Sequence, residues 1–445
     1  MSSKQPLEIV ESRWHNTGFT DVEIDQLREL GRSLARTRSA DPVEEDESSD
    51  LFDDEGVKTW IRCSRSGSKA PWRLLVPEAI GAVGTLGQTI IVHPKIPSNH
   101  FMHIAKYSIG APHVANAEIH VESLTQFWEV LAHWFVTRLE AMLSIDLYRD
   151  YRGASSNLRL IRGAVNPILS TQNWLMGKPE MFCEFEEFDA DNAINRTLHE
   201  AVLRIAGSPF ITSYDLKRRA RVAGHHFEGL SSFNWSDLYV DFDRSAQSWM
   251  PTFDLASRII HASGESVSPG TKSGASFLFR TPLLMEDGLR EILRSHLVGF
   301  VEVSKRSKKL IPETLSASPD LVLDAPAEIL KLPSIVLDSG VVVGDVKYKI
   351  SEGKWTKSRA DLAQLVFFAS AFQSAAGFLV NFQTTPDYAS ADDAFVGNVP
   401  YRMIAWDTTL EDPSVAEAKF VGEVRQWLLE VLSESGLWHH LESVS

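Results

Sequence analysis

The sequence predicts a multidomain α+β protein with a β-rich N-terminal region, a helical middle region and a C-terminal α/β core on a mixed sheet. Three observations lead to this prediction. The chain has 445 residues, which is enough for two or three domains. Its hydrophobic content of 44% and charged content of 23% are ordinary for a globular protein. The spacing of apolar residues changes along the chain, from short strand-like runs to long helical patterns and then to an alternation of both.

The N-terminal region, residues 1–122, is predicted to contain one helix followed by short strands. The helix is expected over residues 20–37, where apolar side chains lie near helical spacing. The strands are apolar or alternating runs bounded by Gly, Ser or Pro. They are expected at Val57–Cys63, Trp72–Val76 and Thr89–Val92. Residues 40–56 are strongly acidic and hold no Lys or Arg, which favours a solvated linker; a docking tail for a basic partner is the alternative.

The middle region, residues 123–265, is predicted to be helical. Its helices are expected at 123–147, 190–207 and 236–262. The second of these begins near Asn192, a residue type that caps free backbone N–H groups at helix starts. The segment Ser263–Ser276 is rich in Gly and Ser, so it is expected to be a linker into the last domain.

The C-terminal region, residues 266–445, alternates helices with strands, which predicts a mixed α/β sheet. Helices are expected at 283–300, 360–375 and 414–432, and strands at 319–323, 341–347, 377–382 and 403–406. The longest apolar stretch, Leu362–Phe382, contains polar residues and is divided by Gly377. We therefore expect a buried helix followed by a strand, and not a membrane span.

Composition and missing motifs exclude several functions. The formal net charge of -15 argues against a non-specific DNA-coating protein, although a local basic groove remains compatible with it. The two cysteines, Cys63 and Cys183, form no CxxC pair, which excludes a disulfide framework and favours a reducing, cytoplasmic location. Residues 1–18 lack the apolar core of a signal peptide. Gly270-Thr271-Lys272-Ser273 lacks the order of a P-loop, so the chain is not expected to hydrolyse nucleotides itself.

Two acids and a lysine on neighbouring predicted strands are the main candidates for chemistry. Asp320 precedes the first strand, whereas Asp345 and Lys347 lie in the second. Residues i and i+2 of a strand project to one face, so Asp345 and Lys347 are expected to project together. Two carboxylates can hold Mg²⁺, and a nearby ammonium can orient a water or offset charge on a phosphate. This layout resembles the metal-dependent phosphodiesterases of the PD-(D/E)XK nuclease superfamily.

Further residues are candidates for supporting roles. Glu286, in the preceding helix, is a candidate third metal ligand or holder of a metal-bound water; the alternative is a solvated glutamate. Gln364 is a candidate to orient Lys347 or to touch the DNA backbone; the alternative is a half-buried helix glutamine. Two basic clusters are candidates for phosphate contact, with solvated loops as the alternative. They are Lys305, Arg306, Lys308 and Lys309, and Lys349, Lys354, Lys357 and Arg359.

Longer strings around these residues resemble the McrC family, the nuclease subunits of McrBC-type modification-dependent restriction systems. These strings are Pro319–Leu323, Gly344–Lys349 and Ala360–Leu365, with upstream matches at Ile90–Ile96, Arg149–Arg152, Arg162-Gly163 and Asp191–Arg196. The resemblance covers most of residues 75–385. The chain departs from the family pattern at two positions. Arg280 stands where an aspartate is usual after Phe-Leu-Phe, and Phe368 replaces the tyrosine of Gln-x-x-x-Tyr.

The resemblance implies a Mg²⁺-dependent DNA endonuclease of a defence system. In it, Glu286, Asp320 and Asp345 would bind Mg²⁺, Lys347 would position the attacking water and Gln364 would support the lysine. It also implies double-stranded, modified DNA as the substrate and a separate AAA+ GTPase motor as the partner, which residues 1–122 would engage and stimulate. Two alternatives stay open: a regulatory adaptor that activates the motor while its nuclease is weak or dormant, and a stand-alone PD-(D/E)XK nuclease.

Overall fold

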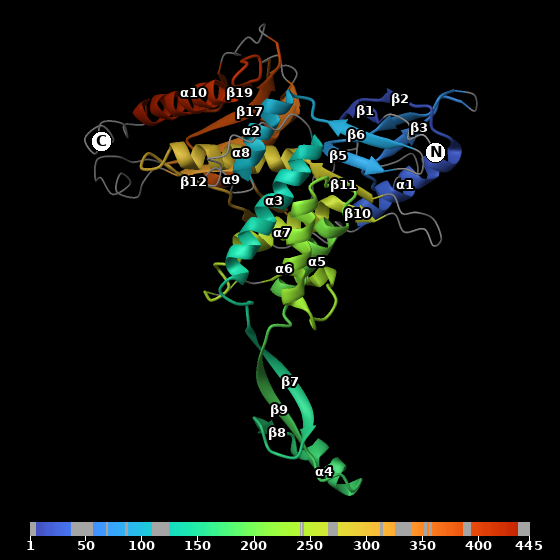
Figure 1. The fold of residues 1–445 in the computed structure, drawn as a ribbon. Coiled ribbons are helices and arrows are strands. Elements are labelled where there is room, and N and C mark those ends of the chain that lie inside the picture. Colours follow the sequence, from blue (N-terminus) through green and yellow to red (C-terminus); the bar gives the residue numbers. More distant parts are fainter. Residues whose placement is uncertain are drawn as a thin grey trace, which may run out of the picture. The chain divides into compact units, whose positions relative to one another are not determined.

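The computed structural model of this chain is a mixed α+β protein with several sheets, in agreement with the predicted fold class (Figure 1). It describes residues 6–36, 57–67, 70–84, 88–108, 124–240, 242, 244–265, 275–311, 315–324, 340–350, 354–355, 358–385 and 393–434. The acidic segment 40–56 lies outside the described residues. The chain divides into two compact units, one of residues 1–127 and 264–445 and the other of residues 128–263.

This division differs from the predicted order of three consecutive domains. The N-terminal and C-terminal regions share one unit, because β11 (Ala275–Arg280) pairs antiparallel with β5 (Ala79–Gly84). The expected linker Ser263–Ser276 accordingly includes β10 (Ser263–Glu265) and the first residues of β11. A Gly- and Ser-rich composition indicates only local chain flexibility. The pairing of β11 with β5 joins segments almost two hundred residues apart, so local composition could not predict it.

The N-terminal part of the first unit contains two sheets. The larger has the strand order β1-β6-β5-β11-β10, with β1 (Leu7–Val10) parallel to β6 (Thr89–His93). The smaller has the order β2-β4-β3 and consists of β2 (His15–Asn16), β4 (Arg73–Leu75) and β3 (Arg62–Ser64). The strand expected at Val57–Cys63 is therefore shorter than predicted and begins at Arg62. The strand expected at Thr89–Val92 is β6.

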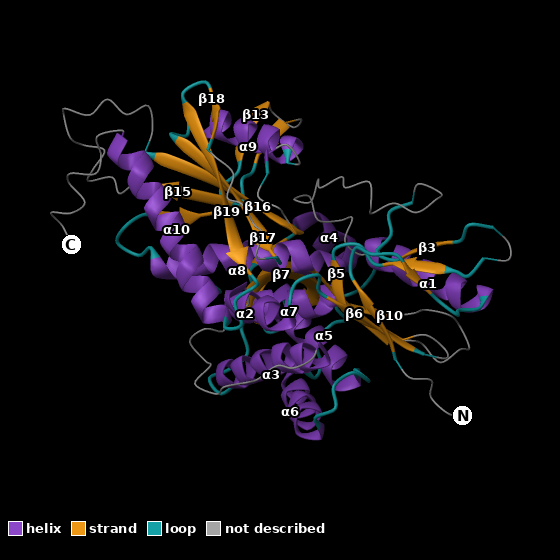
Figure 2. Ribbon diagram, turned by 90° about the horizontal axis from the view of Figure 1, so that it is seen from above, coloured by secondary structure: helices purple, strands orange, loops and turns teal. Residues whose placement is uncertain are grey.

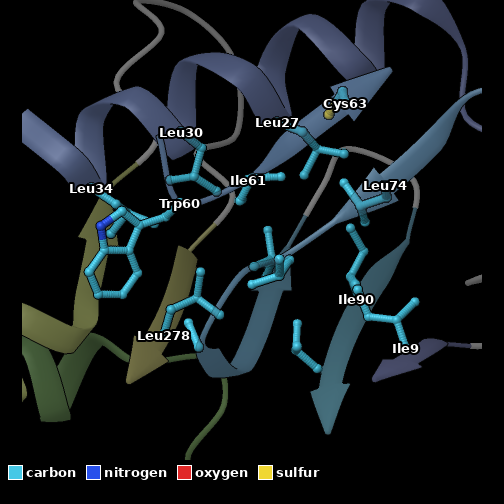
Figure 3. Packing of buried hydrophobic residues seen from close by; sticks show 14 of the residues in the cluster. Ile9, Leu27, Leu30, Leu34, Trp60, Ile61, Cys63, Leu74, Ile90 and Leu278 are labelled. Carbon is cyan, nitrogen blue, oxygen red and sulfur yellow. The ribbon is translucent and has the colours of Figure 1, made fainter. Parts of the chain in front are cut away.

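Helix α1 (Asp21–Arg36) covers these strands with one apolar stripe, as the spacing of its sequence predicts. Leu27, Leu30 and Leu34 lie three and four residues apart and are all buried in one core cluster. Figure 3 shows this cluster, in which Trp60 lies below Leu34 and Leu278 is contributed by β11. The core therefore binds the first residues of the chain to a strand of the C-terminal region.

The C-terminal part of the first unit contains the predicted mixed sheet, with strand order β12-β15-β16-β17-β19-β18. Its strands are β12 (Glu302–Ser304), β15 (Leu321–Asp324), β16 (Val341–Ile350), β17 (Ala376–Gln383), β19 (Val399–Asp407) and β18 (Ala394–Val396). β16 and β19 run parallel to β17 between them, whereas the β12–β15, β15–β16 and β18–β19 pairs are antiparallel. A separate two-stranded sheet pairs β13 (Lys308–Ile311) with β14 (Leu315–Ala317).

Helices cover both faces of the mixed sheet (Figure 2). Helix α9 (Arg359–Phe372) packs Leu365 and Phe368 in one cluster with Met403 of β19. Trp406 of β19, which alternation places on the opposite face, contacts α2 (Ser98–Ser108) and α10 (Pro413–Glu434). The apolar stretch Leu362–Phe382 thus forms part of α9 and then β17, as expected. No helix among the described residues has the length and apolar character needed to cross a membrane.

Helix α8 (Thr281–His296) packs closely on α2, and Gly288 makes this approach feasible. A Cβ at position 288 would lie 2.4 Å from the backbone oxygen of Ile104. In an exposed helix, replacing glycine by alanine stabilises by about 1 kcal/mol. Here we expect the opposite sign: Gly288→Ala should destabilise the protein by about 1–3 kcal/mol, because the backbone of α2 must move. Thermal unfolding measures this change, and an unchanged or raised Tm would contradict the close packing.

The second unit is helical, as predicted, but it also contains a long β-hairpin that was not predicted. Its helices are α3 (Leu124–Leu143), α5 (Ala193–Gly207), α6 (Tyr214–Gly224) and α7 (Met250–Ala262), with short 3-10 turns at His225–Phe227 and Trp235–Leu238. Asn192 caps α5 as expected, because its side chain accepts a hydrogen bond from Asn195 N. The hairpin pairs β7 (Asp150–Leu158) with β9 (Met181–Asp189) and carries β8 (Ala164–Val165) and α4 (Pro167–Leu175) at its far end, away from α5 and α6 (Figure 1).

Candidate carboxylate and lysine site

Asp320 and Asp345 meet where β15 begins. Leu321, the first residue of β15, is opposite Gly344 of β16, so Asp320 lies beside the continuation of β16. One Asp320 carboxylate oxygen, Oδ2, accepts a hydrogen bond of 2.8 Å from Val346 N. Both aspartates are buried, with exposed fractions of 8% and 2%. The structure therefore brings these two predicted acids together at the end of a buried strand.

Lys347 lies two residues after Asp345 on β16, and its ammonium turns back to that acid. Lys347 Nζ is 3.0 Å from Asp345 Oδ2, which makes an ion pair. The pair does not have hydrogen-bonding geometry, and Asp345 Oδ2 has no hydrogen-bond partner within the described part of the chain. A buried carboxylate oxygen without a donor is costly, which marks this position as a candidate for binding something else.

Glu286, in the middle of α8, is the third predicted acid of the site. Burial and then the charge of Asp320 raise the pKa of its carboxyl group. On its other side, Lys305 Nζ is 3.7 Å from Glu286 Oε2. The structure thus joins Glu286 to the two aspartates through Asp320.

Arg290 also belongs to this site, and sequence reasoning missed it. Arg290 is buried on α8, one turn after Glu286, and its Nη1 donates a hydrogen bond of 3.0 Å to the backbone oxygen of Asp320. It also forms an ion pair with Asp287. Arg290 therefore fixes the start of β15 against α8. The only sequence signal was an arginine on the apolar side of an amphipathic helix, where a charged residue needs a partner.

Gln364 is exposed on α9, whereas Asp361, on the first turn of the same helix, is buried. Lys349 Nζ is 2.9 Å from Asp361 Oδ1, and the Asp361 charge also acts on Lys347. Among the described residues, Asp361 is therefore the α9 side chain that is electrostatically joined to the predicted lysine. The role predicted for Gln364 stays a prediction.

The basic clusters of the sequence are partly engaged with neighbouring acids. In the first cluster, Lys305 lies near Glu286 and Arg306 forms an ion pair with Asp324. Lys308 Nζ donates to the backbone oxygen of Ala371. In the second, Lys349 is paired with Asp361, and Lys357 lies outside the described residues. The predicted role of these cations in phosphate contact stays a prediction, and it would require several of them to exchange partners.

The pKa of Asp345 and that of Glu286 are both raised, in part by the neighbouring Asp320. Burial and then the neighbouring Asp320 raise the pKa of Asp345 to about 8, although Lys347 opposes this shift. Burial, followed by Asp320, raises the pKa of Glu286 well above its usual value. Burial alone would lower the pKa of Lys347, but Asp345 and Asp320 outweigh it, so the net pKa is raised. The site is therefore short of positive charge, and full ionisation of its acids requires another cation.

A pH-dependent stability follows from the raised pKa of Asp345. The folded state holds this proton up to about pH 8, whereas the unfolded chain releases it near 3.8. Stability should therefore fall as pH rises between these two values. Asp345→Asn removes the charge, so in EDTA its Tm should exceed that of the wild type at pH 8, and the difference should shrink toward pH 4. A difference that is independent of pH would contradict this assignment.

The donor set fits a divalent cation held by few protein ligands. No group of three or more His, Cys, Asp or Glu side chains within the described residues is arranged to hold a metal ion by itself. Mg²⁺, however, is usually held by one or two carboxylates together with waters and substrate phosphates. Asp320 and Asp345 meet that smaller requirement, since Asp345 Oδ2 accepts no hydrogen bond from the described residues.

Together these features define a mixed α+β protein with a buried carboxylate and lysine cluster at the end of a strand in a mixed sheet. The family model described as "McrBC 5-methylcytosine restriction system component" matches residues 74–381. This match covers more than half of the chain, and the chain belongs to that family. The matched range includes Glu286, Asp320, Asp345 and Lys347.

A solved structure has a similar fold. A chain of the refined half-complex from the tetradecameric assembly of Thermococcus gammatolerans McrB AAA+ hexamers with bound McrC is similar, with a TM-score of 0.52 and 14% identity over 95% of this chain and 100% of that chain. A chain of the Thermococcus gammatolerans McrBC complex gives a TM-score of 0.42 and 14% identity over 66% and 88% of the two chains. No curated protein is significantly similar in sequence.

Proposed function

We propose that this chain is the DNA-cleaving subunit of an McrBC-like restriction system and acts as a Mg²⁺-dependent endonuclease. One observation carries the proposal: a buried carboxylate oxygen of Asp345 lies beside Asp320 and 3.0 Å from Lys347 Nζ, with no hydrogen-bond donor among the described residues. A structural ion pair would not require a second carboxylate within interaction distance. A metal-dependent phosphodiesterase site requires two carboxylates that bind a metal ion and a basic side chain directed at the same phosphate position.

The residues have distinct roles in this proposal. Asp320 and Asp345 would hold Mg²⁺, and the bound ion would supply an activated water and offset charge on the phosphate. Lys347, kept protonated by its neighbours, orients the attacking water and stabilises the charge that develops on the phosphate oxygens. Glu286 holds water on the side of the site formed by α8. Asp361 restrains Lys347 through the charge of its carboxylate. Arg290 keeps the Asp320 backbone in place.

We further propose that the chain acts with an AAA+ GTPase. The family name contains 5-methylcytosine, which suggests methylated DNA as the substrate, and the similar half-complex contains McrB AAA+ hexamers with bound McrC. The far end of the β7–β9 hairpin offers a suitable contact surface. It exposes large apolar side chains that a soluble protein normally buries. They are Leu160, Ile161, Ile168, Trp174, Leu175 and Met176, with exposed fractions from 65% to 84%.

The proposed contact surface differs from the region that the family resemblance implies. The resemblance implies that residues 1–122 engage the motor, whereas the exposed apolar residues of the hairpin lie in the second unit. We therefore assign the main partner contact to the hairpin and leave the N-terminal sheets a supporting role. An AAA+ ring suits a long hairpin as its ligand, because the apolar tip can be buried only by a partner that surrounds it.

A reconstitution tests the proposed function. The purified chain, its AAA+ partner, GTP and Mg²⁺ are combined with DNA that contains 5-methylcytosine. We expect double-strand cleavage that requires all of these components and is weaker on unmethylated DNA. Stimulated GTP hydrolysis without cleavage would instead support a regulatory adaptor. Cleavage by the chain without its partner would support a stand-alone nuclease.

A further inference from the structure

A second buried polar cluster lies next to the proposed nuclease site and has no role in the chemistry described so far. Its centre is Glu11, which follows β1 and is fully buried. Glu11 Oε1 accepts a hydrogen bond of 3.1 Å from Lys95 N, after the end of β6, and Oε2 accepts one of 2.6 Å from the Thr281 hydroxyl. A carboxylate with no exposed surface is uncommon, and its hydrogen-bond donors come from two separate segments of the chain.

The Thr281 contact ties Glu11 to the start of α8. Thr281 is the first residue of α8, and no side chain of the preceding residue caps the helix. The Glu11 carboxylate therefore lies at the helix N-terminus, where negative charge is favourable. Helix α8 carries both Glu286 and Arg290 farther along. Glu11 thus fixes the beginning of α8, which supplies Glu286 and, through Arg290, holds Asp320.

The same cluster contacts β16 through Tyr348. Tyr348 directly follows Lys347, so alternation places it on the opposite face of the strand. Its buried ring lies 4.1 Å from Lys95 Nζ, measured to the ring centroid, and contacts Phe382 edge-to-face. Burial first, and then the nearby Glu11, raise the pKa of Tyr348. One side of β16 therefore carries the catalytic candidates, while the other contacts Lys95, whose backbone N donates to Glu11.

We propose that Glu11 is a positioning residue that, with Lys95 and Tyr348, sets the distance between α8 and β16 in the proposed nuclease site. This inference rests on the proposed endonuclease function. Glu286 and Arg290 belong to α8, whereas Asp345 and Lys347 belong to β16, and Glu11 contacts or lies beside residues of both elements. Removal of its carboxylate leaves the Thr281 hydroxyl and Lys95 N without their acceptor, so the two elements lose a shared anchor.

Two Glu11 variants separate positioning from general stability. Glu11→Ala deletes the anchor, and we expect single-turnover cleavage by the assembled complex to fall at least about tenfold, because small displacements of reacting groups are costly. Its affinity for DNA and its stimulation of the partner's GTPase should stay within about twofold of wild type, since neither surface contains Glu11. Glu11→Gln retains an oxygen for Lys95 N and an amide for Thr281, so it should restore most of the cleavage rate.

Asp407→Asn is the matched control. Asp407 is also buried and accepts from Lys419 at 2.7 Å, but it joins β19 to α10, which carry no candidate site residue. Its Tm and cleavage rate show how much activity a comparable buried change removes.

The proposal is overturned if Glu11→Ala cleaves as fast as Asp407→Asn at equal stability, or if Glu11→Gln is as impaired as Glu11→Ala. If Glu11→Ala does not fold, Tyr348→Phe and Lys95→Met take its place. The proposal is then overturned if both of these variants cleave DNA as fast as Asp407→Asn. Absence of cleavage by the wild-type complex would instead refute the endonuclease function itself.

Discussion

Asp345→Ala should reduce Mg²⁺-dependent DNA cleavage by the assembled complex about 10³-fold, equivalent to about 4 kcal/mol of lost transition-state stabilisation. The variant removes the buried acid that forms an ion pair with Lys347 at 3.0 Å. It also leaves Asp320 without the second carboxylate needed to collect a cation. Cleavage is measured in single-turnover assays at saturating partner and GTP.

Companion variants show whether the loss is specific. Lys347→Met should lose a similar factor, because the ammonium acts on the same reacting groups. Asp393→Asn, which disturbs the carboxylate paired with Arg402 at the other side of the same sheet, should cleave normally. Partner binding and GTPase stimulation should be unchanged in all three variants. Cleavage by Asp345→Ala within about tenfold of the wild type would remove this acid from the active site.

The second large effect is expected at the hairpin. Replacing Trp174 and Leu175 together by serine should weaken binding to the AAA+ partner at least about thirtyfold, because a single tryptophan anchor at an interface contributes about 2 kcal/mol or more. Both side chains are about three-quarters exposed, at 76% and 75%, so the stability of the free chain should not fall. Affinity is measured by calorimetry, and stimulation of GTP hydrolysis gives an independent readout.

Leu203→Ser provides the control for this experiment. Leu203 is also exposed, at 53%, but it lies on α5 of the same unit and not on the hairpin. It should bind the partner as the wild type does. Equal affinities for the hairpin variant and the control would show that the apolar tip has another use.

Local patterns predicted many elements of this fold, and long-range pairing explains most of the departures. The apolar spacing of residues 20–37 and of the stretch 362–382 anticipated α1, α9 and β17 within a few residues, because the helices bury an apolar face and β17 is buried along its whole length. The β7–β9 hairpin was missed because its strands mix exposed apolar and charged residues, as Met181–Asp189 illustrates. A strand that is not half-buried lacks the alternation on which the prediction depends.

The site shows the same limit at the scale of single residues. Asp320, Asp345 and Lys347 could be predicted because strand alternation and strand ends follow from local sequence. Arg290 and Glu11 could not, because their roles arise from contacts with Asp320 and Thr281 that only the packed structure creates. Nothing around Glu11 in the sequence distinguishes it from an exposed glutamate.

Iron-directed cleavage of the protein tests the proposed metal site most directly. Fe²⁺ replaces Mg²⁺ in the purified chain, and ascorbate with peroxide then cuts the backbone near the bound ion. We predict cuts beside Asp320 and Asp345 that disappear with excess Mg²⁺ and in the Asp345→Asn variant. Cuts confined to another acidic group, such as Glu417 with its partners His103 and His296, or cuts that persist unchanged in Asp345→Asn, would contradict the account.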